Sequence, residues 1–511
     1  MAIIRAFLVL LTLAEVTLAL RPVPTQNISS PLTRKSFPPG FLFGASGSAY
    51  QFEGAASEDG RRPSMWDTYS KDHPERILDH TTGDVAIDFY HRYKEDIELM
   101  KYEGMDAFRF SISWSRVLPY GKLSKGINQH GITFYKNLID EIIAKGIVPM
   151  VTIFHWDVPQ ALEDEYQGFL SPHIVDDFRD FADLCFREFG EKVKLFATIN
   201  EPWTFSSKGY DSGDFAPGRC SPFMNPTAGC LGGDSATEPY IVGHHIILAH
   251  AAAAKVYREK YQATQKGKVG IVLVSHWFEP YSSTPEDKKA AQQAIDFMFG
   301  WTLHPLTYGD YPKSMRTLVG DRLPKFTSDQ SEMAKGSLDF LGLNYYTARY
   351  AKYISSPNKV NISYTYDSLA NLTSEKNGKL IGAATGSTEF FVVPSGLQKL
   401  LLYTKNNYKN PIIYITECGM SSLGVTSIVK EGVNDTERVD FYNSHILAVK
   451  HAIGLGAKVE GFFAWSFFDN YEWSSGFTSR FGLNFIDYEN GLKRFPKKSA
   501  LWMKKFLQQD I

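Results

Sequence analysis

The sequence has little net charge, few cysteines and only one long apolar run. Its 54 Lys and Arg residues nearly balance 56 Asp and Glu residues, for a net charge of −2 with no block of one sign. This balance argues against nucleic acid and against an anionic membrane surface as partners. The four cysteines form no CxxC pair and no HxxxH spacing occurs, so we expect neither a metal ion nor another cofactor.

The one long apolar run lies at the N-terminus, in residues 1–20. It contains a single Arg, continues as a short apolar stretch and ends in small residues near Ala19. This pattern is typical of a secretory signal peptide, so we predict that residues 1–19 are removed and that 20–511 form the mature chain. The run is too short to span a bilayer, and Glu15 interrupts it.

Entry into the secretory pathway changes how the cysteines are interpreted. Cys220 and Cys230 flank a loop rich in Pro and Gly, and we predict a disulfide between them. Cys185 lies in an amphipathic helical pattern and Cys418 at the end of an apolar run, so we expect both to be free and buried. Four N-glycosylation sequons agree with the same pathway, beginning at Asn27, Asn361, Asn371 and Asn434.

The chain contains eight β-rich apolar runs separated by helical patterns. The runs are mostly continuous rather than alternating in polarity, which is typical of parallel strands covered on both faces. Eight such β-then-α units predict a single (β/α)8 TIM barrel over 20–511, with long loops around 203–240 and 349–390. The runs cover residues 41–51, 105–116, 147–157, 193–202, 268–280, 340–347, 411–419 and 459–473.

Nearly every run ends in side chains that an apolar core does not favour. In a (β/α)8 barrel the C-terminal ends of the strands form the face that carries the active site. One or two polar strand ends would be ordinary, but so many at one rim indicate a site. These residues are Gln51, Arg116, His155, Asp157, Asn200, Glu201, Asn344, Tyr346, Glu417 and Glu472.

Two carboxyl groups stand out among these residues. Glu201 and Glu417 end the fourth and seventh runs, so a closed barrel would bring them to one mouth. Cleavage of a glycosidic bond needs such a pair, an acid for the leaving oxygen and a second group facing the anomeric carbon. A separation of about 5–5.5 Å gives retention of configuration and about 6.5–9.5 Å gives inversion, and the sequence leaves both open.

Several segments resemble one family. INEP (199–202) and ITECG (415–419) look like the two signatures of glycoside hydrolase family 1. The similarity also covers GSAYQFEG, FRFSISWSR, FHWDVPQ, GLNYYT and AWSFFDNYEW, and it extends from about Phe37 to Leu507. It is closest to the plant β-glucosidases. The resemblance therefore implies a retaining β-glucosidase that acts on a small-molecule β-glucoside or a short β-linked oligosaccharide, and it leaves the oligomeric state open. With the signal peptide, we expect the enzyme in the apoplast or the vacuole.

The resemblance also implies roles for individual residues. Glu417 would be the nucleophile that forms a covalent glycosyl-enzyme, and Glu201 the acid that protonates the leaving oxygen and then the base that activates water. Arg109 and Tyr346 would orient the nucleophile, and Trp465 would stack beneath the sugar. The substrate-binding positions would be Gln51, His155, Asn200, Asn344, Tyr346, Trp465, Glu472, Trp473 and Phe481.

These roles carry electrostatic expectations. Glu201 must hold a proton near neutral pH, so burial and the charge of Glu417 should raise its pKa toward about 6. Esterification of Glu417 removes that charge, and the pKa of Glu201 should then fall, as a base requires. A carboxylate at Glu472 would repel a 6-phosphate, which argues against a phospho-glycosidase. Glu rather than Gln at position 201 argues against the thioglucosidase branch.

Two positions depart from the family pattern. Cys418 stands where the family usually has Asn, and we expect a small buried residue there rather than a reactive thiol. Glu389 stands where the family often has a Trp that supports the leaving group. Three interpretations remain open: a more polar leaving-group subsite, replacement of the Trp by Phe390, or a Glu389 side chain that points to solvent.

Three other functions compete with a hydrolase. A glucosyltransferase on the same scaffold would use the same catalytic residues and pass the glucosyl group to an acceptor other than water. A non-catalytic sugar-binding protein would be expected to have lost one of the two carboxyl groups, and both are present. A metal hydrolase built on His155 and Asp157 would lack enough ligands at a suitable spacing.

Overall fold

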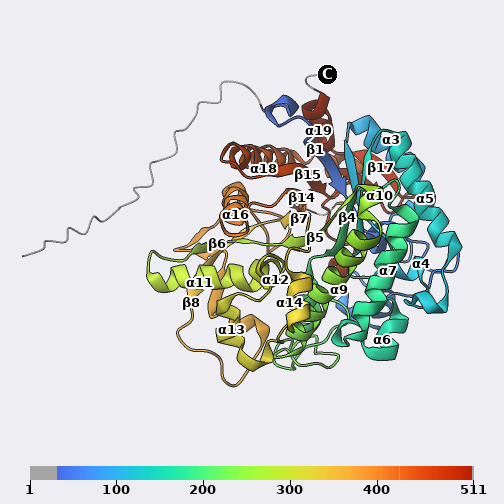
Figure 1. Ribbon diagram of the computed structural model, residues 1–511. Coiled ribbons are helices and arrows are strands. Elements are labelled where there is room, and N and C mark those ends of the chain that lie inside the picture. Colours follow the sequence, from blue (N-terminus) through green and yellow to red (C-terminus); the bar gives the residue numbers. More distant parts are fainter. Residues whose placement is uncertain (1–31, 425, 509–511) are drawn as a thin grey trace, which may run out of the picture. The chain divides into compact units, whose positions relative to one another are not determined.

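The computed structural model describes residues 32–424 and 426–508. Eight parallel strands in this part close into a barrel, in the order β1-β15-β14-β7-β5-β4-β3-β2 (Figure 1). The predicted (β/α)8 barrel is therefore confirmed. The barrel strands are β1 (Leu42–Ser46), β2 (Ala107–Ser111), β3 (Val148–Phe154), β4 (Leu195–Asn200), β5 (Lys268–Val274), β7 (Phe340–Tyr345), β14 (Ile413–Cys418) and β15 (Val459–Trp465).

Each predicted run contains one barrel strand but extends beyond it. The run 41–51 ends in the short helix α1 (Ala49–Phe52), and the run 268–280 divides into β5 and β6 (Trp277–Pro280), which lies in a separate sheet. The run 459–473 continues past β15 as a buried loop. Apolar composition therefore persists after the strands end, because the segments that follow them are also buried.

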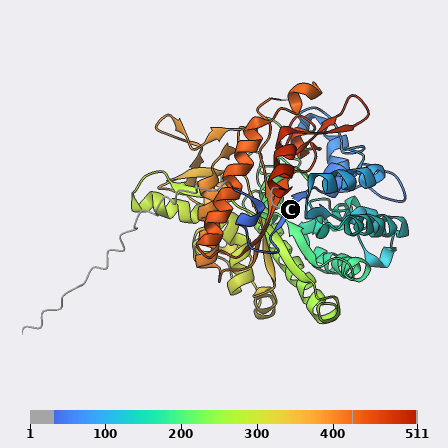
Figure 2. The same ribbon diagram turned by 90° about the horizontal axis from the view of Figure 1, so that it is seen from above.

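Helices surround the barrel on its outer side (Figure 2). In Figure 1 the strand labels lie between α16 and α18 on one side and α5 and α7 on the other. The longest helices are α3 (Phe89–Glu103), α5 (Gln129–Ala144), α7 (His173–Phe189), α9 (Glu238–Lys260), α11 (Pro285–Ile295), α16 (Pro394–Asn407), α18 (Thr436–Gly454) and α19 (Lys498–Gln508). The others are α2 (Met65–Asp72), α4 (Trp114–Val117), α6 (Gln160–Tyr166), α8 (Pro202–Tyr210), α10 (Gln262–Gln265), α12 (Trp301–Tyr308), α13 (Lys313–Val319), α14 (Ser328–Ala334), α15 (Tyr364–Asp367) and α17 (Val429–Gly432).

The helix α7 shows why these segments cover a sheet. Apolar residues recur on one face of it at helical spacing, and Phe178, Phe181, Cys185 and Phe189 are all buried. The thiol of Cys185 is therefore part of the packing between helix and barrel. Both Cys185 and Cys418 are free and buried, as predicted.

The interior of the barrel is filled by side chains from seven strands. These residues come mainly from the first halves of the strands, below the C-terminal mouth: Ala107, Met150, Leu195, Ala197, Val272, Phe340, Tyr414 and Phe463. A filled interior is usual for this fold and gives the mouth a rigid floor.

The segment 349–390 differs from the expected loop. It contains strands of three small sheets, so much of its backbone is hydrogen-bonded. The strands are β8 (Ala348–Tyr353), β9 (Ala370–Thr373), β10 (Glu375–Lys376), β11 (Lys379–Leu380) and β12 (Ala383–Ala384), which pairs with β13 (Phe391–Val392). A further pair, β16 (Asn484–Asp487) and β17 (Lys493–Pro496), follows the barrel.

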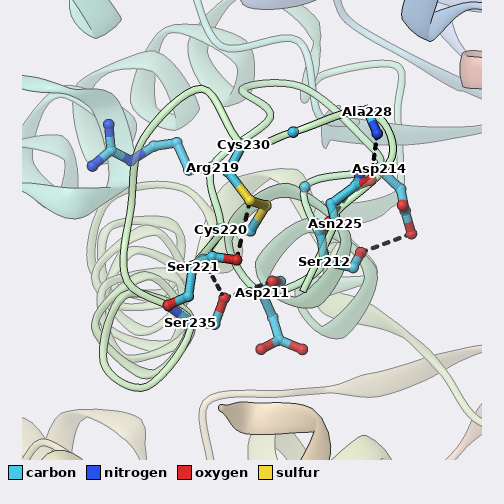
Figure 3. The surroundings of a disulfide bond; sticks show 12 residues. Asp211, Ser212, Asp214, Arg219, Cys220, Ser221, Asn225, Ala228, Cys230 and Ser235 are labelled. Atoms are coloured by element: carbon cyan, nitrogen blue, oxygen red, sulfur yellow. Dashed lines mark hydrogen bonds between the residues drawn. A yellow bond between two sulfur atoms is a disulfide. The ribbon is translucent and has the colours of Figure 1, made fainter. Parts of the chain in front are cut away.

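A disulfide between Cys220 and Cys230 closes the loop after α8, as predicted, with the Cα atoms 5.2 Å apart (Figure 3). Nearby, Ser235 Oγ donates a hydrogen bond to Asp211 O at 2.7 Å. This irregular segment has few backbone ladders of its own, so the covalent link and such local hydrogen bonds hold its shape.

Two predictions concern residues outside the described part. The signal peptide over 1–19 and the sequon at Asn27 lie there, and both stay predictions. Within residues 32–424 and 426–508, no helix combines the length and apolar character needed to cross a bilayer.

Candidate active site

Glu201 and Glu417 occupy equivalent positions on two distant strands. Glu201 directly follows β4, and Glu417 is the last residue but one of β14. Their side chains line one cavity of about 520 Å³, although each residue is only 5% and 3% exposed. Two carboxyl groups that are remote in sequence are thus brought to one largely dry space.

The local backbone explains how each carboxyl group reaches the cavity. Glu201 has a φ of 44°, in the left-handed region, where the chain turns from β4 into α8 with Pro202 as its first residue. In β14 the register against β7 shifts between Ile415 and Glu417, which sets Glu417 opposite Asn344.

Gly419, in the ITECG segment, is required by a close approach between two strands. A Cβ atom on Gly419 would lie 1.9 Å from the carbonyl oxygen of Trp465, so only glycine allows this close approach. The approach brings the end of β14 against the end of β15. It places the Trp465 ring in the same cavity as Glu417.

A continuous chain of hydrogen bonds connects the two carboxyl groups. Arg109 donates to Glu417 Oε1 at 2.5 Å and to Asn200 Oδ1 at 2.7 Å. Asn344 Nδ2 donates to Glu201 Oε1 at 2.6 Å and to the same Asn200 Oδ1 at 3.3 Å. Guanidinium and amide groups are planar, so this chain fixes the position of one carboxyl group relative to the other.

Further donors fix the remaining oxygens. Tyr346 Oη donates to Glu417 Oε2 at 2.5 Å. Thr204 Oγ1 donates to Glu201 Oε2 at 2.6 Å. Thr416 Oγ1 donates to Asn344 Oδ1 at 2.7 Å, which leaves Asn344 Nδ2 to face Glu201. Sequence reasoning missed Thr204 and Thr416, although Thr204 follows Glu201 at the i, i+3 spacing of one helical turn.

The environments of the two carboxyl groups differ in charge. Burial, and then the charge of Glu417, raise the pKa of Glu201 to about 8, above the value near 6 that we expected. Burial also raises the pKa of Glu417, but Arg109, Tyr346 and Asn344 oppose that rise. Because Arg109 pairs directly with Glu417, the first proton taken up by the pair goes to Glu201.

The predicted sugar-binding residues form two groups. One group lines the cavity: His155, Tyr346, Trp465, Glu472, Trp473 and Phe481. The other group, together with the predicted nucleophile-orienting Arg109, is fully buried, and each member is hydrogen-bonded to a residue that lines the cavity: Gln51 to Glu472, Arg109 to Glu417, Asn200 to His155 and Asn344 to Glu201. Their contact with a sugar stays a prediction.

Burial shifts the pKa values of two polar residues of the cavity wall, Glu472 and His155. Burial and the charges of Glu417 and Glu201 raise the pKa of Glu472 to about 8. The raised pKa favours the protonated form of Glu472, which weakens the expected repulsion of a 6-phosphate. Burial lowers the pKa of His155 well below its usual range, so its imidazole is neutral.

Aromatic rings form much of the wall near the carboxyl groups. Trp473 stacks on His155 with ring centroids 5.8 Å apart, and Phe390 stacks on Tyr346 at 5.1 Å. Phe390 also packs against the cluster of Tyr346, Trp465 and Phe481. Aromatic rings therefore pack directly around the Tyr346 hydroxyl that binds Glu417.

The Glu389 side chain lies at the rim rather than wholly in solvent. It is 58% exposed, yet its Oε1 lies 3.7 Å from Lys208 Nζ, and both residues line the cavity. Lys208 also contacts Asp214 at 3.2 Å. The polar-subsite interpretation and the Phe390 interpretation both remain compatible with this arrangement.

A second cavity of about 610 Å³ adjoins the first and is bordered by the disulfide-closed loop. The two cavities share Lys208, Phe215, Glu389, Phe390, Glu472, Trp473 and Phe481. The first cavity also has an apolar part that sequence reasoning missed, including Trp203, Val274, Phe297 and Met298. Trp203 directly follows the INEP segment, and this position next to Glu201 could have indicated that Trp203 lines the cavity.

A (β/α)8 barrel with two coupled, buried carboxyl groups at its C-terminal mouth defines a scaffold for glycosidic-bond cleavage. The model of glycosyl hydrolase family 1 matches residues 33–510, and the chain belongs to this family.

Related proteins narrow the class. Furcatin hydrolase of Viburnum furcatum is 58% identical over 471 residues, which are 92% of this chain and 86% of that protein. β-Glucosidase 12 of Oryza sativa subsp. indica is 56% identical and covers 93% of each chain. The protein is therefore an enzyme, a β-glucosidase of the plant group, and not a sugar-binding protein without activity.

Solved structures agree with the fold. A rice β-glucosidase in a covalent complex with glucose is 47% identical, with a TM-score of 0.91 over 93% of this chain and 100% of that one. A family 1 β-glucosidase from the fungus Humicola insolens, in complex with glucose, is 39% identical, with a TM-score of 0.88 over 94% and 99% of the two chains.

Proposed function

We propose that the protein is a secreted β-glucosidase that retains the anomeric configuration. It hydrolyses the terminal β-D-glucosyl bond of a small-molecule glucoside or a short β-linked oligosaccharide. The observation that carries this proposal is the hydrogen-bonded chain through Arg109, Asn200 and Asn344, which connects Glu417, paired with Arg109, to Glu201, whose pKa burial and the charge of Glu417 raise.

In the first step Glu417 attacks the anomeric carbon while Glu201 gives its proton to the leaving oxygen. The direct ion pair with Arg109 and the hydrogen bond from Tyr346 keep Glu417 ionised and aim its oxygens. The raised pKa of Glu201 keeps the acid loaded at neutral pH. The bond to the leaving oxygen breaks, and a covalent glucosyl ester on Glu417 forms.

In the second step the same residues exchange roles. Esterification removes the negative charge of Glu417, which is the second-largest cause of the raised pKa of Glu201. Arg109, now without its anionic partner, lowers that pKa further. Glu201 can then accept a proton from water, which attacks the ester and releases glucose with its original configuration.

The wall residues support recognition of a glucosyl ring. A sugar has a hydroxyl edge and an apolar C–H face, so protonated Glu472 and neutral His155 suit the edge and Trp465 suits the face. The apolar part of the cavity, which includes Trp203, Phe297 and Met298, would then receive the leaving group. It fits a leaving group with an apolar or aromatic body.

The secretory location belongs to the same proposal. The disulfide Cys220–Cys230 and the sequons at Asn361, Asn371 and Asn434 support passage through an oxidising, glycosylating compartment, toward the apoplast or the vacuole.

A glucosyltransferase remains the alternative, because the apolar part of the cavity could also hold an acceptor alcohol. The two functions differ only in what attacks the glucosyl ester. Analysis of the products with and without an added alcohol distinguishes them, since a transferase forms alkyl glucoside where a hydrolase still releases mainly glucose.

The test of the nucleophile is the Glu417→Gln variant. Gln has nearly the same shape but cannot attack the anomeric carbon, so turnover of 4-nitrophenyl β-glucoside should fall by at least about 10⁴-fold. A folded variant with unchanged turnover would contradict the assignment. Wild-type enzyme followed by proton NMR should release β-glucose first, and α-glucose as the first product would contradict retention.

A further inference from the structure

One predicted glycosylation site lies at the catalytic cavity. Asn371 belongs to β9, which pairs with β8 so that Asn371 lies opposite Lys352. The residue is exposed, yet it is among the residues that line the cavity containing Glu201 and Glu417. It begins the sequon Asn371-Leu372-Thr373.

The side chain of Asn371 is available for modification. Among the described residues it has no hydrogen-bond partner, and the neighbouring Leu372 is 44% exposed. The sequon at Asn361 differs, because Asn361 is half-buried and its third residue, Ser363, is fully buried. Asn434 is exposed but borders a separate pocket beside Glu431.

The attachment point is held firmly at the rim. In the segment just before β9, Thr365 Oγ1 donates to Asp211 Oδ2 at 2.6 Å. Arg322 and Tyr240 both hydrogen-bond to Asp367, each at 2.6 Å at its shortest. A group attached to Asn371 would therefore start from a fixed position beside the entrance.

We propose that Asn371 carries an N-linked glycan that narrows the entrance of the catalytic cavity and disfavours glucosides with bulky leaving groups. The proposal rests on the secretory part of the proposed function. The donor is an oligosaccharide linked to a lipid pyrophosphate. A bond forms between Asn371 Nδ2 and the anomeric carbon of the oligosaccharide, the bond from that carbon to the pyrophosphate oxygen breaks, Nδ2 loses one proton, and the lipid pyrophosphate leaves.

The glycan would act on the leaving group rather than on glucose. The sugar-recognition candidates Trp465 and Glu472 lie on buried segments, whereas Asn371 and the 41%-exposed Tyr366 belong to the exposed part of the lining. A small leaving group remains inside the cavity. A bulky one extends past the rim, where a hydrated glycan occupies the same space.

The experiment uses the full chain from a glycosylating secretory host. Glycopeptide mass spectrometry reads the occupancy of Asn371. Two variants, Asn371→Gln and Thr373→Ala, each remove the sequon by a different residue. For a flavonoid β-glucoside we expect kcat/KM to rise about fivefold in both variants, a ratio that corresponds to about 1 kcal/mol. For phenyl β-glucoside we expect no more than about a twofold change.

Two controls separate the glycan from the side chain. Asn434→Gln removes an exposed sequon away from the cavity, so kcat/KM should not change for either glucoside. Wild-type enzyme and Asn371→Gln made in a host without N-glycosylation should have the same ratio of kcat/KM values for the two substrates.

Two results would overturn the proposal: an unoccupied Asn371 in the secreted protein, or an unchanged ratio after an occupied sequon is removed. The phenyl β-glucoside assay tests the proposed hydrolase function separately, because that reaction requires no glycan.

Discussion

Thr204 makes the hydrogen bond that most directly tunes the candidate acid. Its Oγ1 donates to Glu201 Oε2 at 2.6 Å, and this bond favours the ionised carboxylate and lowers its pKa. Thr204→Val removes the donor, so the pKa of Glu201 should rise above about 8. The alkaline limb of kcat/KM for phenyl β-glucoside should then move up by as much as about one pH unit. Thr204→Ser keeps the donor and should leave the limb in place; a downward shift in the Val variant would contradict this role.

Tyr346 serves the other carboxyl group, and its ring and hydroxyl can be separated by mutation. Tyr346→Phe keeps the stack on Phe390 but removes the donor to Glu417 Oε2. A hydrogen bond to a charged group contributes about 1.5–3 kcal/mol, so formation of the glucosyl ester should slow by about 10- to 100-fold. Single-turnover kinetics with 2,4-dinitrophenyl β-glucoside measure this step directly, because that leaving group needs no acid. Phe390→Ala is the matched control for loss of the stack alone, and a Tyr346→Phe rate equal to wild type would contradict the role.

At the scale of elements, the disulfide-closed loop after α8 can be separated from catalysis. A disulfide that closes a loop of this length contributes about 2–3 kcal/mol, so the double variant Cys220→Ser/Cys230→Ser should lose that much unfolding free energy. Neither cysteine lines the cavity with the carboxyl pair, so kcat/KM for phenyl β-glucoside should stay within about twofold of wild type. Denaturant unfolding measures the first quantity. Added reductant should destabilise wild type but not the double variant, and equal stability of the two proteins would contradict the prediction.

The elements also show which parts of the site the sequence could predict. Parallel strands covered on both faces read as apolar runs, and their carboxyl ends meet at one mouth, so β4 and β14 alone implied that Glu201 and Glu417 face one cavity. The run over 268–280 misled, because Trp277 and Phe278 extend its apolar character into β6, which pairs with β8 outside the barrel. Apolar composition reports burial and not the sheet in which a strand lies.

Side-chain contacts between strands were the least predictable part. The bond from Thr416 to Asn344 and the placement of Glu417 opposite Asn344 depend on a register shift in β14 that has no local sequence signal. Gln51 and Asn200 are expected to contact sugar from their positions in family motifs, and that stays a prediction; the sequence did not indicate their hydrogen bonds to Glu472 and His155. Such contacts arise from packing in three dimensions, which one sequence does not record.

At the scale of the whole molecule, burial raises the pKa of carboxyl groups both inside and outside the site. Burial raises the pKa of Glu103, Glu201 and Glu472 to about 8 each. The unfolded chain titrates these groups near 4.3, so between about pH 4.3 and pH 8 the native state binds more protons. Their contribution to stability is therefore fully present below about pH 4.3 and is lost progressively as pH rises from there to about 8.

Buried histidines set the acid limit of this effect. Burial lowers the pKa of His244 and His445 to about 4, and of His250 and His276 to about 3. Below about pH 6.5 the unfolded chain protonates its histidines while the native state does not, so stability falls there. Between pH 6.5 and pH 8 the carboxyl groups dominate, opposed only near the upper end by Lys497, whose pKa is lowered to about 8.

The unfolding free energy should therefore increase when pH falls from 8 to 6.5, by about 1.6 kcal/mol for each of the three carboxyl groups. Calorimetry at a fixed scan rate should show a higher thermal midpoint at pH 6.5 than at pH 8. Glu103 allows a test outside the site: its Oε2 accepts from Asn484 at 3.4 Å, and its Oε1 has no partner among the described residues. Glu103→Gln keeps the shape but cannot titrate, so the increase should shrink by about a third. Two results would show that these buried carboxyl groups are not protonated in the native enzyme: a lower thermal midpoint at pH 6.5 than at pH 8, or a Glu103→Gln variant with the full wild-type increase in stability.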